Sequence, residues 1–280
     1  MAGRTARVAA VARLEWADVS RSRWLIFCSA LYAALAALFV LAGLRESSVL
    51  GFTGMGRVLL SMCNALVLIL PLLALAGCGQ VVNGARDDGA LEFLFSLPVA
   101  RGEYFAAVSL VRFLALLAPL LVLMPALGLV GLWGFDQPIP WGFLGRSLAI
   151  SASLLWSFAG IGLALTVWVR NQAKALMYLL LAWIVGVALL DFALIGLMLQ
   201  WRLNPEAVFL LACLNPAQCA RMALLSAADP SLAALGPVGF HLAHRVGAAT
   251  LFVAGVAWPT TVGCLAWAAG WGRFRRGDLV

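Results

Sequence analysis

The chain has 280 residues, of which 64% are hydrophobic and 11% are charged, whereas soluble domains are about 45–50% apolar and about 25% charged. Together with a mean hydropathy of +1.01, this composition excludes a soluble globular domain, because no long hydrophilic stretch is left to form one. Nineteen Lys and Arg against twelve Asp and Glu give a net charge of +7. In a membrane protein this excess indicates orientation and lipid contact rather than nucleic-acid binding.

The chain also lacks the sequence signatures of enzymes. Its one lysine, Lys174, follows Ala173, so there is no GxxxxGK(S/T) loop to hold the phosphates of ATP. Six cysteines and two histidines form no CxxC or HExxH pattern, and no GxSxG motif is present. We therefore predict that the chain is not an enzyme and that any ATP driving it is hydrolysed by another polypeptide.

The first 23 residues predict a helix that lies in the membrane interface. Apolar residues recur at helical spacing along one face, namely Val8, Ala12, Trp16 and Val19. Charged residues, among them Arg7 and Asp18, lie on the opposite face, as is typical of interfacial helices. A solvated basic tail is the alternative interpretation, and the sequence leaves it open.

Six apolar runs come after this helix, each long enough to cross a hydrocarbon core of about 30 Å as a helix. They are residues 24–44, 58–82, 104–132, 143–169, 175–200 and 248–271. The runs lack the alternation of barrel strands, and backbone groups in lipid must bond within their own segment. The sequence therefore predicts an all-α integral membrane protein with six transmembrane helices, forming one transmembrane domain over residues 1–280.

The basic residues predict the orientation of this domain. If the N-terminus is cytoplasmic, the cytoplasmic side carries twelve basic residues and the other side carries five, while Arg112 and Arg146 fall inside spans. Cytoplasmic loops of membrane proteins are enriched in Lys and Arg. We therefore expect both termini in the cytoplasm of a bacterial cell, with the spans in its inner membrane.

The linker between the second and third spans, residues 83–103, predicts a short helix of its own on the cytoplasmic side. Gly89 opens the turn before it, and Pro98 ends it. One face of this helix is apolar and is formed by Leu91, Leu94 and Phe95.

Acidic residues surround this apolar face, namely Asp87, Asp88 and Glu92. Helices that rest on the bilayer surface usually carry Lys and Arg instead. We therefore favour docking of the segment into a groove on a soluble partner, for which the apolar face supplies the anchor. A loop helix resting on the bilayer remains the alternative.

The motif D-D-G-A-L-E-F-L-F-S-L-P, with the order of spans around it, resembles the ABC-2 type permease superfamily. In that superfamily the linker reads like E-x-x-x-G-T-L-E-x-L-L-x-x-P and forms a coupling helix that seats in an ATPase subunit. The matching positions are Gly89, Leu91, Glu92, Leu94 and Pro98. Ala90 replaces the usual Thr, and Asp87 or Asp88 stands where Glu is usual. The resemblance implies an ABC-2 (type V exporter-like) fold, with ATP and Mg bound by a partner subunit and no cofactor in this chain.

Three further stretches, residues 12–25, 189–194 and 214–226, are similar to the membrane subunits of ABC transporters that serve nitrous oxide reductase. That resemblance implies a homodimer with two cytoplasmic ATPase subunits and a periplasmic β-helix protein. It also implies a role in assembling the copper sites of the reductase, and therefore in denitrification.

Ionisable residues inside the spans are a second group of candidates. Asp191 lies near the middle of the fifth span, where an isolated charge costs about 2.5–3.5 kcal/mol. We expect it to face the bundle interior or water, as a dimer-interface or gating residue or as a structural hydrogen-bonding group. Arg112 and Arg146 lie closer to span ends, where contact with lipid headgroups is the favoured interpretation.

The segment 201–247 between the last two spans predicts a helical cap on the periplasmic side. We expect Pro216 at the first position of a helix that Asn215 caps. With Arg221, these two residues are our candidates for contact with the periplasmic partner, and a purely structural cap is the alternative. Cys213 and Cys219 lie in or near the oxidising periplasm, and whether they pair is left open.

No metal site is predicted in the chain. Met55, Met62 and Cys63 gather near the outer face, but their spacing matches no compact copper site. His241 and His244 supply two ligands at most, which is too few for a site.

The leading hypothesis is a membrane subunit that couples ATP hydrolysis below the bilayer to a change above it. An ABC-2 exporter of a lipid or another hydrophobic substrate is the alternative within transport. An integral membrane enzyme or an ATP-independent carrier would instead need converging ionisable groups or paired repeats. The sequence does not indicate whether a solute is translocated.

Overall fold

The structure is a computed structural model that describes residues 2–45, 54–135, 141–189, 211–228 and 247–277. The described elements are all helical, as expected of an all-α membrane protein. Asp191, His241 and His244 lie outside the described residues, as do the side chains of Met55 and Cys63, so the predictions made for them stay predictions.

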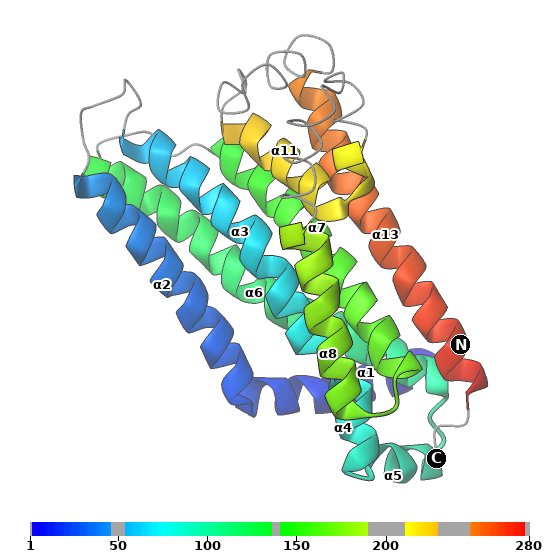
Figure 1. Cartoon of the computed structure of the whole chain (residues 1–280). Coiled ribbons are helices and arrows are strands. Elements are labelled where there is room, and N and C mark those ends of the chain that lie inside the picture. The colour runs from blue at the N-terminus through cyan, green and yellow to red at the C-terminus, as the bar shows by residue number, and fades with distance from the viewer. Residues whose placement is uncertain (1, 46–53, 136–140, 190–210, 229–246, 278–280) are drawn as a thin grey trace.

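The described helices are α1 (Ala2–Arg21), α2 (Arg23–Arg45), α3 (Gly54–Cys78), α4 (Val81–Asp87), α5 (Ala90–Ser96), α6 (Arg101–Phe135), α7 (Trp141–Trp168), α8 (Gln172–Trp183), α11 (Pro216–Ala228) and α13 (Ala248–Arg276). The last turns of the α8 span are π-helical and are labelled η1 (Ile184–Leu189). Long helices form a bundle, while α1, α4 and α5 lie at one end of it and α11 near the other (Figure 1). We call these the α5 end and the α11 end.

Five of the described helical segments are long and apolar enough to cross a membrane. They are Asn64–Asp87, Arg101–Val130, Trp141–Trp168, Gln172–Leu189 and Ala248–Arg276. Within α2, the stretch Arg23–Leu38 is apolar but shorter. The described residues therefore support a membrane protein with several spans, and the count of six stays a prediction.

Helix α7 is the most central element, and α13 packs along it over most of its length. Glycines permit this close packing: a Cβ atom on Gly160 would overlap the backbone of Gly263. In membranes the hydrophobic effect does not drive helices together, and small residues at the contact allow the close packing that does. The α7–α13 pair is therefore the rigid centre of the bundle.

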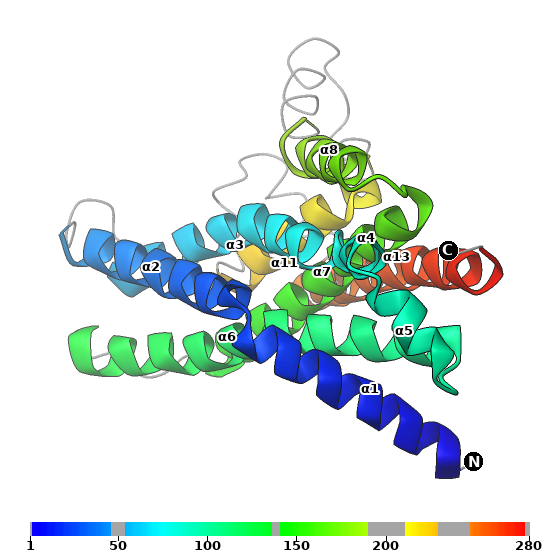
Figure 2. The same cartoon turned by 90° about the horizontal axis from the view of Figure 1, so that it is seen from below.

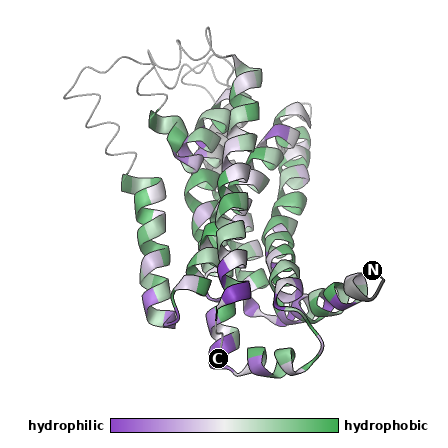
Figure 3. Cartoon of the chain, turned by 90° about the vertical axis from the view of Figure 1, so that its right-hand side faces the viewer, coloured by the Kyte–Doolittle hydropathy of each residue, from purple (hydrophilic) through white to green (hydrophobic). Residues whose placement is uncertain are grey.

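The outer surface of the bundle is apolar along the helix shafts. Leu121, Val122, Leu181, Val253 and Leu265 are exposed there. In Figure 3 the shafts are mainly green, and purple residues are frequent at the α5 end. This distribution is what a protein surrounded by lipid requires. Helix α1 and the end of α13 lie at the same end of the molecule, so the two terminal helices end on one side (Figures 1 and 2).

Candidate coupling site at the α5 end

The predicted short helix is present as α5, and the turn before it has the expected chemistry. Gly89 adopts φ 72°, ψ 1°, a left-handed conformation that glycine enters without a steric penalty. It lies between the end of α4 at Asp87 and the start of α5 at Ala90, where the chain turns so that α5 lies across the direction of α4 (Figure 1). Leu97 is extended, with φ −87° and ψ 158°, because the following Pro98 disfavours a helical residue before it.

The apolar face of α5 is correctly predicted, but its environment is not. Leu91 is only 3% exposed, and Leu94 and Phe95 pack against the core of the bundle. This face closes the end of the bundle and is not available to a partner in this structure. The exposed apolar residues of the segment are Phe93 (71% exposed) and Leu97 (48%).

The acidic residues of the segment are exposed, as these two side chains are. They are Asp87, Asp88 and Glu92. Exposed apolar and acidic side chains therefore occur on one short segment, and its most exposed apolar residue is Phe93 rather than one of the predicted leucines. We call Asp87, Asp88, Glu92, Phe93 and Leu97 the docking surface.

Beneath the docking surface, aromatic rings join α5 to two long helices. Phe95 meets Tyr104 of α6 edge to face, with ring centroids 5.9 Å apart, and lies 6.3 Å from Phe274 of α13. Tyr104 and Phe274 are themselves stacked at 6.0 Å. Such contacts stabilise a cluster beyond the area they bury. The sequence does not indicate this cluster, since its members are up to 179 positions apart, from Phe95 to Phe274.

Hydrogen bonds from the buried Asn83 hold α4 against the end of α7. The backbone N–H of Asn83 donates to Thr166 Oγ1 at 3.2 Å, and its Nδ2 donates to the carbonyl of Val169 at 2.8 Å. Its Oδ1 accepts from Arg86 Nη1 at 3.1 Å. Helices α4 and α7 are therefore connected by directional bonds as well as by apolar contact.

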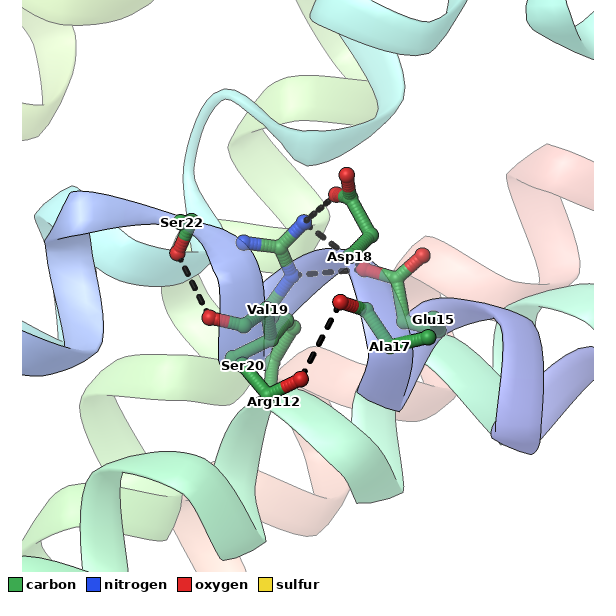
Figure 4. Close-up of polar contacts among 7 residues, drawn as sticks. All are labelled: Glu15, Ala17, Asp18, Val19, Ser20, Ser22 and Arg112. Carbon is green, nitrogen blue, oxygen red and sulfur yellow. Dashed lines mark hydrogen bonds and ion pairs between the residues drawn. The ribbon is translucent and has the colours of Figure 1, made fainter.

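Ion pairs attach α1 to the start of α6. Arg7 donates to both carboxylate oxygens of Glu103, from Nε at 3.1 Å and from Nη2 at 3.0 Å. The hydrogen bonds and charge of Glu103 raise the pKa of the Arg7 guanidinium above its ordinary value. Arg112 forms a second pair, with Glu15, at 2.7 Å, and its Nη2 lies 3.8 Å from Asp18 (Figure 4).

This arrangement corrects two predictions. Arg112 binds carboxylates of α1 rather than lipid headgroups, which the sequence did not indicate because 97 positions separate it from Glu15. In the predicted stripe of α1, Val8, Ala12 and Val19 do face the bundle, but Trp16 is 44% exposed. Val11 is buried in its place, so the stripe is turned slightly about the helix axis. Burial of this face against α6 shows a helix and not a solvated tail, whereas its place in the membrane interface stays a prediction.

A cavity of about 560 Å³ lies between α1, α4, α5 and α6. Its polar lining includes Glu15, Asp18, Asp88 and Arg112, and Leu91 and Trp24 contribute apolar surface. The cavity and the docking surface share Asp88 and neighbouring backbone. Within the α5 end, the segment 87–98 therefore exposes acidic and apolar side chains, while basic residues such as Arg101 and Arg273 lie on the elements around it.

Comparison with known proteins identifies the family. A family described as "ABC-2 family transporter protein" matches residues 9–279. The chain belongs to this family. It is 29% identical over 254 residues to the probable ABC transporter permease protein NosY of Stutzerimonas stutzeri, covering 89% of this chain and 92% of that protein. It is also 28% identical over 279 residues to the protein of the same description from Pseudomonas aeruginosa, covering 95% and 97%.

In this ABC-2 transporter protein, the α5 segment thus carries the motif that resembles the coupling helix of the family. The seven predicted coupling residues lie together on α4, α5 and their connections, and the structure divides them by role. Gly89 and Pro98 shape the segment, Leu91 and Leu94 attach it, and Asp87, Asp88 and Glu92 face outward.

At the α11 end of the permease, the predicted helix cap is confirmed. Helix α11 begins at Pro216, and Asn215 Oδ1 accepts the backbone N–H of Ala217 at 3.0 Å. Asn215 Nδ2 also donates to the carbonyl of Gly186, in the π-helical stretch η1. Asn215 is only 6% exposed, so its side chain acts within the chain and is not presented to a partner here. Pro216 and Arg221 are half-buried, and their contact with a partner stays a prediction.

The two cysteines near this helix are free thiols in the structure. A hydrogen bond between them lowers the pKa of the Cys213 thiol and raises that of Cys219. Among the residues that the structure describes, no group of three or more His, Cys, Asp or Glu side chains is placed to hold a metal ion. Met62 is buried at 3% exposure in the core.

Proposed function

We propose that this permease binds a cytoplasmic ATPase subunit through the docking surface and passes the movement of that subunit to its α11 end. The observation that carries the proposal is Phe93, an aromatic side chain that is 71% exposed beside acidic residues on a rigidly attached helix. Exposed aromatic anchors with a polar rim dominate the affinity of protein interfaces. The inner face of α5 supplies the rigidity, because Leu91 and Phe95 are packed on the bundle.

Two copies of the chain form the working unit in this proposal. Each chain contains one α5 segment, and an ABC transporter uses two ATPase subunits that come together when they bind ATP. Closed two-fold symmetry is the commonest arrangement of such assemblies. The termini and the docking surface then lie in the cytoplasm of a bacterial cell, and α11 lies on the periplasmic side of the inner membrane.

A continuous set of contacts supports movement from one end to the other. Phe95 of α5 contacts Phe274 near the end of α13. At the other end of α13, Ser153 Oγ of α7 donates to the Gly255 carbonyl at 3.1 Å, and a Cβ atom on Gly255 would overlap Ala223 of α11. Helix α13 therefore touches both the docking segment and the outer helix.

The relatives named NosY, together with the three sequence stretches that resemble their subfamily, favour copper-site assembly of nitrous oxide reductase as the process served. In this proposal a periplasmic β-helix protein receives the movement at the α11 end. Arg221 and Pro216 are the predicted contacts there, while Asn215 holds the helix that presents them.

Export of a lipid or another hydrophobic compound is the second candidate, and one observation favours it. A cleft of about 510 Å³ lies between α2 and α6, and its lining is almost entirely apolar. Tyr32 lines this cleft, and no partner of its hydroxyl is found among the described residues. Ser29 is the other polar side chain in the lining, and apolar pockets of this size with a few polar groups are typical of sites for small ligands.

The cargo distinguishes the two candidates. We expect cells that lack this chain to make nitrous oxide reductase with less copper, and we expect the chain carrying its native α5 segment to restore it. The copper content of the purified reductase measures this directly. Reductase with a full copper complement in the deletion strain would contradict the copper-site role and favour export of a hydrophobic compound.

Docking is tested separately by purifying the chain in mild detergent. The expected result is an ATPase subunit that copurifies and whose hydrolysis rate depends on the α5 segment. A preparation in which no nucleotide-hydrolysing protein contacts residues 87–98 would contradict the coupling role altogether.

A further inference from the structure

Asn83 is a polar residue with no exposed surface, and its place in the fold is not explained by packing alone. It lies on α4, between a break in the helix at Gly79–Gln80 and the turn at Gly89. Burying an amide side chain is unfavourable unless hydrogen bonds compensate for lost water. Asn83 uses its backbone N–H, its Nδ2 and its Oδ1 for such bonds.

Two of the partners of Asn83 lie at the end of α7, and the third, Arg86, lies on α4 itself. Thr166 is itself fully buried and accepts the backbone N–H. The carbonyl of Val169 lies just past the end of α7, where helices leave carbonyls without partners inside the helix. By donating to it, Asn83 completes the end of α7 with a group from α4. The two helices are thereby joined at one point.

This joint lies where α4 would otherwise be able to bend away from α7. Helix α3 ends at Cys78 and α4 begins at Val81, and a break in a helix is a place at which it can bend. If α4 were free of α7, displacement of α5 would bend the chain at Gly79–Gln80, and the movement would reach the bundle only through the aromatic contacts of Phe95 with α6 and α13. Hydrogen bonds have a fixed direction and length, so they resist such displacement more than apolar contacts do.

We propose that Asn83 is a positioning residue that passes movement of the docking segment into α7. This inference rests on the proposed function, since it concerns how docking of the ATPase subunit reaches the bundle. Asn83 itself is buried and does not contact the partner. Replacing a residue of the docking surface should change both the affinity of the ATPase subunit and the response at the α11 end. Replacing Asn83 should change only the response.

The experiment uses the complex of the chain with the ATPase subunit that copurifies with it. Hydrogen–deuterium exchange over residues 211–228 is measured with and without ATP, and the affinity of the ATPase subunit is measured in parallel. Asn83→Leu removes the side-chain bonds at similar volume, and Thr166→Val removes the acceptor of the Asn83 N–H without changing shape. Gly84→Ala is the matched control, because Gly84 lies inside the same helix with open space around it and makes no side-chain bond to α7.

For Asn83→Leu we expect the affinity to stay within about twofold and the ATP-dependent exchange to fall about fivefold, the size typical of residues on a coupling network. Thr166→Val should lower the exchange response in the same direction, and it serves as the test if Asn83→Leu does not fold. Gly84→Ala should respond like the native chain.

A native-sized response in both α4–α7 variants would overturn the inference and leave the proposed function intact. So would a matching loss of affinity, because Asn83 would then only shape the docking surface. If the native complex shows no ATP-dependent exchange at residues 211–228, no movement is transmitted and the inference is also overturned. If no ATPase subunit binds the native chain, the proposed function fails and the inference fails with it.

Discussion

Phe93 projects from a helix whose other face is fixed to the bundle, so its side chain is held outward at little further entropic cost. Rigid, exposed aromatic groups of this kind make the largest contributions to protein interfaces, because they bury much apolar area with few rotamers to order. The three neighbouring carboxylates contribute more to partner choice than to affinity, as charges at a rim do.

Replacing Phe93 with Ala should therefore weaken binding of the ATPase subunit by about 30-fold or more, since truncating an interface anchor costs about 2 kcal/mol or more. The measurement is a binding titration with the purified subunit. Trp141→Ala is the matched control, since Trp141 is an aromatic residue that is 65% exposed at the opposite end of α7. Equal affinities for the two variants would mean that Phe93 is not the anchor.

The Arg112–Glu15 pair shows a second residue-scale effect. Its side chains are 18% and 14% exposed, so solvent screens their attraction less than it screens a surface pair. Asp18, by contrast, lies 3.8 Å from Arg112 and its side chain is 74% exposed. The two carboxylates therefore contribute differently to the free energy of unfolding, although both lie near the same guanidinium.

Glu15→Gln should lower the free energy of unfolding by about 1–2 kcal/mol, as expected for a charge-assisted hydrogen bond that is partly shielded from water. Asp18→Asn should change it by less than about 0.5 kcal/mol. Thermal unfolding in detergent, combined with Arg112→Met in a double-mutant cycle, measures both. A larger coupling for Asp18 than for Glu15 would contradict the geometry.

Among the elements, α5 shows which features can be predicted from neighbouring residues in the sequence and which cannot. Its bounds depend on the Gly89 turn and on Pro98, and the cap of α11 depends on the Asn215–Pro216 pair. These features are set by residues within one helical turn. The direction in which α5 faces depends instead on Tyr104 and Phe274, and periodicity identifies an apolar face without identifying which residues cover it. The ion pairs of α1 were missed for the same reason, because their partners are distant in the chain.

The Gly89 turn provides an element-scale prediction. A side chain at φ 72° costs about 1–2 kcal/mol, so Gly89→Ala should loosen the connection between α4 and α5. The expected result is faster amide exchange over residues 90–96 and weaker binding of the ATPase subunit. Gly84→Ala is the control, since Gly84 lies inside α4 with open space around it and alanine favours a helix. Exchange that is equally slow in both variants would show that the turn does not depend on glycine.

For the whole molecule, the distribution of burial indicates an assembly larger than one chain or extensive lipid contact. In the α8 and α13 spans, only 17% and 22% of the most apolar stretch is buried within the chain, against 61% for α7. Exposed apolar surface in a membrane is stable in contact with lipid, so either lipid or a second copy of the chain covers it. The composition of the intact complex gives the number of copies.

Native mass spectrometry of the complex in mild detergent should therefore give two copies of this chain with two ATPase subunits. The physical reason is that one chain supplies one docking segment, while ATP is held between two ATPase subunits. A complex with one permease chain would contradict the proposed symmetry. The Phe93→Ala variant is a useful comparison, because it should lose the ATPase subunits and keep any permease dimer.

Two residues of helix α13 contact other elements, and the number of residues between them fixes the directions in which they face around the helix axis. Gly255 meets α11 near one end, and Phe274 meets the aromatic cluster near the other. Each residue added to a helix rotates the remainder of that helix by about 100° and advances it by about 1.5 Å. One alanine inserted after Cys264 would thus leave the Gly255 contact in place and turn Phe274 away from Phe95. In the proposed mechanism, such an insertion would separate the docking segment from α11 although both contact residues are still present.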